Sequence, residues 1–143
     1  MGAKAQKDYI TLDILKKISN YTVQQFRSYA QEEGFVECDM YDCTYSNCVC
    51  YIDKTMSVSF YRQLNSDGTV TFGFMNMYGD DYDDIFDEVE FSGDFQYVKK
   101  ETNTQVEGTY TRYYYQNNSY YIIFYETSWI QGSGSLDIEI TRK

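Results

Sequence analysis

The sequence predicts a single α+β domain in which helices pack on an antiparallel sheet. Apolar residues recur at helical spacing near the beginning and again in the middle of the chain, whereas alternating apolar and polar residues fill most of the remainder. The 17 Tyr, the 9 Phe and the absence of Pro favour strands, because aromatic rings fit a pleated surface. A chain of 143 residues is long enough for one domain with its own core.

Two segments are predicted to be helical. Between Thr11 and Gly34 the apolar spacing indicates one broken helix or two short ones joined at 20–22, with Gly34 as the stop. A second apolar stripe runs over 80–91 and predicts another helix.

Strands are predicted wherever apolar and polar residues alternate with a period of two. Residues 57–64 and 70–74 alternate around a turn at 65–68, which predicts a hairpin with one buried and one polar face. Four more strands are expected, at about 95–100, 107–115, 119–127 and 134–141.

The pattern predicts that the two halves of the chain repeat one arrangement, a helix followed by an antiparallel meander. Phe26-x-x-Tyr29 matches Phe86-x-x-Val89 at an offset of 60 residues. Neither half has enough helix to cover its own sheet, so we expect the pair to share one core. The arrangement resembles the tandem α/β repeat of the beta-lactamase inhibitor protein family. The expected repeats are residues 11–78 and 79–143.

The first six residues indicate export. Ala3-Lys4-Ala5 has the small-x-small pattern that signal peptidase requires, so we expect Gln6 to begin the mature chain and residues 7–143 to form the domain. The ending Gly2 to Gln6 is similar to the signal-peptide ends of exported proteins in Flavobacterium-like bacteria, and the resemblance implies a periplasmic or secreted protein. The alternative is an ordinary disordered N-terminus at 1–6. No segment has the roughly 18 consecutive apolar residues that a membrane-spanning helix needs.

The charge balance restricts the partners. With 22 Asp plus Glu against 12 Lys plus Arg, the net charge is -10, and such a surface repels nucleic acid and anionic lipid. A basic protein or a cation is the expected partner. The alternative is that the acidity serves only solubility.

The absence of His argues against an enzyme. It removes the usual general base, the usual metal ligand and the partner of a Ser or Cys nucleophile. Paired carboxylates run glycoside hydrolysis without His, but no pair stands out among 22 acidic residues. We therefore predict no catalytic residue, no cofactor and no metal site.

Four acidic residues are expected in the first turn of the helix at 80–91, where they complement the helix dipole. A calcium loop would need an oxygen ligand and a glycine where Ile85 and Phe86 stand. We expect solvated carboxylates, with docking of a basic partner as the functional alternative. These residues are Asp80, Asp81, Asp83 and Asp84.

The four cysteines predict a disulfide staple, as is usual for a cluster in an exported chain. A turn at 44–47 would place Cys43 opposite Cys48 and leave Cys38 to pair with Cys50. A four-thiolate zinc site is the alternative, although the paired C-x2-C spacing is missing. Free buried thiols are the third possibility.

Both faces of the hairpin within 110–129 are apolar or aromatic. Such a hairpin is either a central pair of strands covered on both sides or a strand pair that presents one face to a partner. In the second case the aromatic side chains would anchor the partner, because large rigid rings dominate binding energy. The expected anchors are Tyr113, Tyr115, Tyr121, Tyr125 and Trp129.

The leading functional hypothesis is a non-enzymatic, exported protein-binding module of the inhibitor or immunity type. In it the aromatic residues would occlude a basic active site, and the four Asp residues would steer the encounter. One alternative is a carbohydrate or small-ligand binder that stacks sugars on the same rings. The other is an accessory subunit of an envelope or secretion complex.

Overall fold

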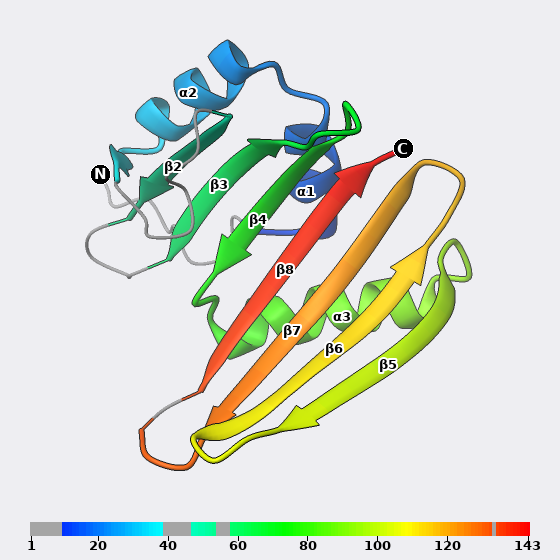
Figure 1. The fold of residues 1–143 in the computed structure, drawn as a ribbon. Helices are drawn as coiled ribbons and strands as arrows, with labels where there is room; N and C mark the ends of the chain where they lie inside the picture. Colours follow the sequence, from blue (N-terminus) through cyan, green and yellow to red (C-terminus); the bar gives the residue numbers. More distant parts are fainter. Residues whose placement is uncertain (1–9, 39–46, 54–57, 133) are drawn as a thin grey trace.

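The computed structural model describes residues 10–38, 47–53, 58–132 and 134–143. Over these residues it has three helices and an eight-stranded antiparallel sheet, which confirms the predicted α+β class (Figure 1). None of these helices has the length and apolar content needed to cross a membrane. The helices are α1 (Leu12–Ser19), α2 (Val23–Glu32) and α3 (Gly79–Phe91). The strands are β1 (Val36–Glu37), β2 (Cys48–Ile52), β3 (Ser59–Leu64), β4 (Val70–Met75), β5 (Gln96–Thr104), β6 (Gly108–Gln116), β7 (Tyr120–Trp129) and β8 (Ser135–Arg142).

Side-chain caps separate α1 from α2. Thr11 begins α1 and accepts a hydrogen bond from the Ile14 N–H at 3.2 Å. Thr22 begins α2 and forms a capping box with Gln25, each side chain accepting from the other's backbone N–H. A cap of this kind contributes about 1 kcal/mol. The predicted joint at 20–22 is therefore correct, and of the two alternatives the chain forms two short helices.

The third helix begins without a side-chain cap at Tyr78. Asp80 and Asp81 occupy its first turn, where their negative charge favours the positive end of the helix dipole. The helix therefore forms over nearly the predicted range.

Two meanders join at the centre of the sheet. The strand order is β1-β2-β3-β4-β8-β7-β6-β5, so the last strands of the two halves pair with each other. This pairing runs from Thr71 opposite Thr141 to Phe74 opposite Ile138. Each half contributes helix and then four strands, but the first half has two helices and the second has one. The tandem repeat itself stays a prediction.

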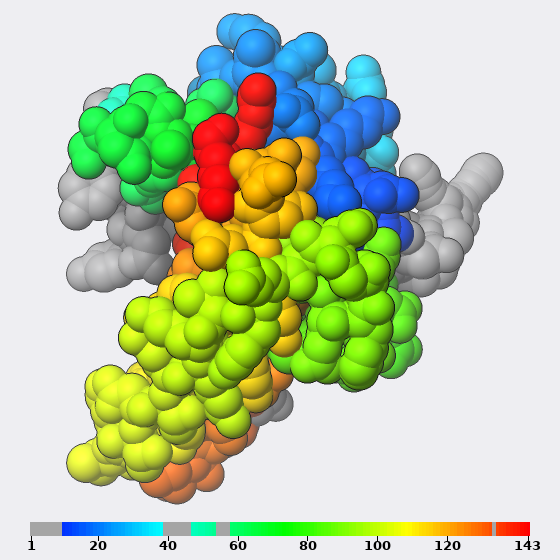
Figure 2. Space-filling view, turned by 90° about the vertical axis from the view of Figure 1, so that its right-hand side faces the viewer, coloured from blue at the N-terminus to red at the C-terminus, as the bar shows by residue number. Residues whose placement is uncertain are grey.

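The core lies between the sheet and the three helices. The Phe26 ring of α2 meets Phe72 of β4 at a centroid distance of 5.4 Å, and Phe86 of α3 meets Phe124 of β7 at 4.7 Å. Phe124 is fully buried, and burying such a side chain stabilises the fold by about 1.5–3 kcal/mol. Figure 2 shows the sheet and the helices from the side as two layers.

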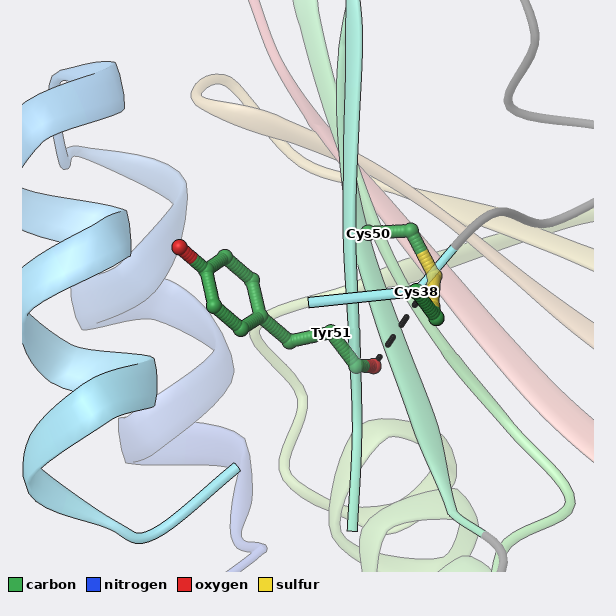
Figure 3. The surroundings of a disulfide bond; sticks show 3 residues. All are labelled: Cys38, Cys50 and Tyr51. Atoms are coloured by element: carbon green, nitrogen blue, oxygen red, sulfur yellow. Dashed lines mark hydrogen bonds between the residues drawn. A yellow bond between two sulfur atoms is a disulfide. The ribbon is translucent and has the colours of Figure 1, made fainter. Parts of the chain in front are cut away.

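A disulfide joins Cys38, just after β1, to Cys50 in β2. Figure 3 shows it on the side of β2 away from the Tyr51 ring, which points toward the helices. The bond closes a loop with a sequence separation of 12, and closing a loop of this size contributes about 3 kcal/mol in the chain-entropy model. Cys48 is disulfide-bonded as well. Its predicted partner Cys43 lies outside the described residues.

Candidate functional site on the open face of the sheet

All three described helices lie on one side of the sheet, and Figure 1 is viewed from the other side. Successive residues of a strand point to opposite faces. Because Ile122, Phe124 and Ile138 are buried against the helices, their neighbours along each strand point to the uncovered side. We call this side the open face. Its aromatic residues are Tyr61, Tyr110, Tyr114, Tyr121, Tyr125 and Trp129.

Three of the five predicted anchors lie on the open face. Tyr121 is 48% exposed and Trp129 is 38% exposed, whereas Tyr125 is half-buried. These three residues extend along β7 at every fourth position, which keeps them on the same face. The strand therefore presents a row of rings to the outside.

The other two predicted anchors, Tyr113 and Tyr115, lie on the helix-covered side of the sheet and not on the open face. Tyr115 is only 4% exposed, and its hydroxyl donates to Glu90 at 3.3 Å. Burial and the charge of Glu90 raise the pKa of Tyr115 to about 12. Tyr113 is half-buried and packs edge-on against Phe86 at 5.1 Å. Both side chains point to α3, because Tyr113 pairs with the inward-facing Phe124.

Sequence reasoning missed three rings of the open face. Tyr114 lies between Tyr113 and Tyr115, and three consecutive tyrosines conceal which one points outward. Tyr110 and Tyr61 follow from alternation, because each is an odd number of positions from an inward-facing residue of its own strand. Counting from Phe60, which is buried, would have found Tyr61.

A shared carboxylate fixes two of the rings. The Glu139 carboxylate accepts hydrogen bonds from the hydroxyls of Tyr61 and Tyr125, the second at 2.7 Å. Burial and the charge of Glu139 raise the pKa of both tyrosines, so the hydroxyls stay protonated donors. The Tyr61 ring crosses β4 over Gly73, where a Cβ atom would lie 2.1 Å from Tyr61 Cε1. Glycine is therefore required for Tyr61 to reach Glu139.

Asp137 lies two residues before Glu139 on the same face. Its Oδ1 accepts a hydrogen bond from the Asn76 N–H at 2.9 Å, and Asn76 has a left-handed backbone with φ of 60°. Burial, together with the nearby Glu139 charge, raises the pKa of Asp137 although the hydrogen bond from Asn76 lowers it. Donors of this chain engage both carboxylates, so we assign the pair a structural role.

Cations lie over several rings of the open face. The Lys143 Nζ is 4.5 Å from the Tyr121 ring centroid, and the Arg112 guanidinium is 5.5 Å from that of Tyr125. Contacts of this kind are worth about 0.5–1 kcal/mol at exposed sites, and they hold the rings in place. The charged side chains are balanced in sign: Lys99, Arg112 and Lys143 against Glu101, Asp137 and Glu139.

The open face ends in a hollow of about 640 Å³. Tyr110 and Arg112 line it with residues of β5 and the turn after β5. The Tyr110 ring stands edge-on to Trp129 at 5.6 Å. The β5 and turn residues of the hollow are Glu101, Thr102, Asn103 and Gln105.

The two turns beside this hollow carry exposed apolar side chains. Val106 is 91% exposed and Ile130 is 73% exposed. The Ile130 N–H donates to the Glu107 carbonyl at 3.0 Å, which ties the two turns together. They form the lower end of the molecule in Figure 2.

The predicted acidic residues lie on the other side of the molecule. Asp80, Asp83 and Asp84 are exposed on α3, and Asp81 is half-buried. The structure therefore does not bring them together with the open-face tyrosines (Figure 1). Within the described part of the chain, no group of three or more Asp, Glu or Cys residues is arranged to hold a metal ion.

Comparisons with protein-family models, curated proteins and solved structures gave no match.

Proposed function

We propose that this chain is a non-enzymatic, exported module that binds a partner protein on the open face of its sheet. One observation carries the proposal: a sheet face without any described helix presents six aromatic side chains from three strands, β3, β6 and β7. Tyr and Trp are the residues that dominate binding energy at protein interfaces. A face of this kind is suited to a partner rather than to water alone.

The rings of the open face are ordered before any partner arrives. Glu139 holds Tyr61 and Tyr125, and Lys143 lies over Tyr121. Ordering a side chain at an interface costs about 0.5–1.5 kcal/mol, so rings that are already fixed lose less on binding. The open face is thus preorganised.

The inhibitor or immunity role is the form of the proposal that we favour. A rigid, broad face suits the covering of another protein's active site, and the net charge of -10 favours a basic partner. The charges on the open face itself are balanced. The preference for a basic partner therefore comes from the net charge of the whole molecule. The Cys38–Cys50 disulfide supports export, because disulfides persist in oxidising compartments.

The acidic start of α3 has a smaller part in this proposal than the sequence predicted. A helix is about 10 Å thick with its side chains, and the Debye length at physiological ionic strength is about 8 Å. Charges beyond the helix layer are therefore largely screened from a partner on the open face. We expect Asp80, Asp83 and Asp84 to contribute little to docking.

Affinity capture with paired variants tests the proposal. The tagged chain, its Tyr121→Ala/Trp129→Ala variant and its Asp80→Ser/Asp83→Ser/Asp84→Ser variant are exposed to the same extract from the native host. We expect one partner to bind the unaltered chain and the α3 variant, and to bind the open-face variant at least about 30-fold more weakly. Equal capture by all three proteins would remove the open face as the docking site.

An activity assay on the captured partner then tests the inhibitor role. We expect an enzyme or toxin to lose activity at a one-to-one ratio with this chain. A partner that stays active in the complex would leave the binding proposal standing and exclude inhibition. Capture of several envelope proteins would indicate an accessory subunit.

The hollow around Tyr110 favours one second candidate, a carbohydrate ligand. An aromatic ring flanked by the amides of Asn103 and Gln105 and the charges of Glu101 and Arg112 has the groups that bind sugars. A glycan array separates the two candidates. Binding that Tyr110→Ala abolishes and Tyr121→Ala leaves unchanged would support the carbohydrate.

A further inference from the structure

A second hollow lies at the opposite end of the sheet, away from the Tyr110 hollow. It has a volume of about 310 Å³ and forms where the end of β8, the β3–β4 turn and the joint between α1 and α2 meet. Figure 2 shows the end of β8, in red, between the β3–β4 segment in green and α1 in blue. Small-ligand pockets have volumes from about 300 to 1,000 Å³.

The charge of this hollow is opposite to that of the whole molecule. Arg62, Arg142 and Lys143 line it, and none of the described residues that line it is acidic. The chain has only 12 Lys and Arg against 22 Asp and Glu, so three cations without an acidic neighbour are a marked local reversal. The nearby Asp67 is not a lining residue, and its carboxylate accepts from the Thr69 N–H at 2.9 Å and from the Thr69 hydroxyl at 2.6 Å.

Arg62 has no partner for its guanidinium in the part of the chain that the structure describes. Its Nε–H is buried and donates to no acceptor, and the ion pairs among the described residues involve Arg27 and Lys99 instead. A buried donor without an acceptor costs about 1–3 kcal/mol. The guanidinium lies over the Phe72 ring at 5.8 Å, which holds it in the hollow.

Arg27 has a structural role and serves as a comparison for Arg62. Its Nη1 donates to the Tyr51 hydroxyl at 3.2 Å and to Glu37 at 3.3 Å. Both arginines come from regular elements on the helix side of the sheet, yet only Arg27 has an acceptor. The difference marks Arg62 as a residue whose acceptor comes from outside the chain.

Other residues that line the hollow add hydrogen-bond donors. The first turn of α2, a helix of 10 residues, begins at Thr22, and its free backbone N–H groups carry the positive end of the helix dipole. Thr22 and Thr69 both line the hollow. The Lys143 ammonium donates to Gln116 at 3.2 Å, so the two arginines are the principal charges.

We propose that this hollow is a binding site for a tetrahedral oxyanion, a phosphate or sulfate group, held by Arg62 and Arg142. Guanidinium groups bind such anions through paired N–H donors, and a helix N-terminus adds further donors. Lys143 borders both this hollow and the open face, but neither arginine lies on the open face, and the proposal does not depend on the proposed function. The volume leaves room for a molecule that carries the phosphate.

An NMR titration at constant ionic strength tests the site. Inorganic phosphate replaces sodium chloride stepwise, and the Arg62 Nε–H and the Val23 and Thr69 amides are followed. We expect saturable shifts at these groups with a Kd of about 1 mM or tighter. A parallel titration with glycerol 3-phosphate separates the two sources: tighter binding indicates a phosphate carried on a larger molecule, and equal binding indicates the free anion.

Variants decide whether the arginines carry the binding. We expect Arg62→Met, which keeps the aliphatic stem, and the exposed Arg142→Gln each to weaken binding by about tenfold or more. Arg27→Met is the matched control and should bind phosphate as the unaltered chain does. The proposal is overturned if phosphate produces no saturable shift, or if both hollow variants bind it normally.

Discussion

The helix-covered face and the open face of the sheet are both rich in aromatic residues, and they use these residues in different ways. On the covered face the Tyr115 ring meets both Phe86 and Phe124 edge-on inside the core. On the open face Tyr61 and Tyr125 direct their hydroxyls to one carboxylate and keep part of each ring outside. The aromatic rings of the covered face stabilise the fold because they are buried. Those of the open face are held in one orientation by hydrogen bonds from their hydroxyl groups.

The difference arises because successive residues of a strand point to opposite faces of the sheet. Tyr113 and Tyr114 are neighbours with the same side chain, yet one packs on α3 and the other donates to Glu101 at 2.7 Å on the open face. Residue type therefore does not decide the role of a tyrosine here. The register with the neighbouring strand does, because it determines which face meets the helices.

The largest expected contrast is between Phe124→Ala and Tyr121→Ala. Phe124 is fully buried, so its truncation leaves a cavity and should lower the free energy of unfolding by about 3–5 kcal/mol. Tyr121 is 48% exposed and loses mainly its contact with Lys143, so its truncation should cost no more than about 1 kcal/mol. Urea denaturation of both variants measures the difference. Similar losses for the two variants would mean that the open face is packed in solution.

A smaller effect is expected from Gly73→Ala. The added methyl group would occupy the place of the Tyr61 ring, which must then leave Glu139. Overpacking of this kind costs about 1–3 kcal/mol. Urea denaturation gives the cost, and NMR of the Tyr61 ring reports the displacement. A variant as stable as the unaltered chain, with the ring in place, would contradict the close approach.

Tyr61→Phe isolates the hydrogen bond from the packing. The ring stays over Gly73, and Glu139 loses one of its two donors. A hydrogen bond to a charged group contributes about 1.5–3 kcal/mol, and the partial exposure of both side chains reduces the expected loss to about 1 kcal/mol. Tyr114→Phe is the matched control on the same face, because Tyr114 bonds the exposed Glu101 and should cost less. A larger loss for Tyr114→Phe would reverse this ranking.

The local elements were largely predictable from the sequence. Thr11 and Thr22 stand where the apolar spacing begins, so both helix starts follow from the pattern, and alternation places β3, β4 and β8 correctly. The Cys38–Cys50 pair was also predicted, as the pair left over once Cys43 is placed opposite Cys48, and the structure confirms it. Each of these predictions depends on residues close together in the chain.

The candidate site was less predictable because it depends on contacts between distant residues. The three tyrosines at 113–115 give no sign of which one faces outward until β6 is paired with β7. The link from Tyr61 to Glu139 joins residues 78 positions apart and requires Gly73 on the strand between them. The position of the four Asp residues of α3 opposite the open face depends on how the chain crosses from β4 to that helix.

The smallest and most specific prediction concerns Asp137→Asn. The folded-state pKa of Asp137 is raised, so folding favours the protonated carboxyl, and its stabilising contribution is lost as the pH rises through the folded pKa. Asparagine imitates the protonated form and keeps an oxygen that accepts from the Asn76 N–H. The variant should therefore have a higher Tm than the unaltered chain at pH about 7, and the gain should vanish below the ordinary Asp pKa of about 3.9. Thermal denaturation across this range measures the gain. A gain that grows on acidification would show that the charged Asp137 stabilises the fold, and that the open face tolerates buried charge better than its geometry indicates.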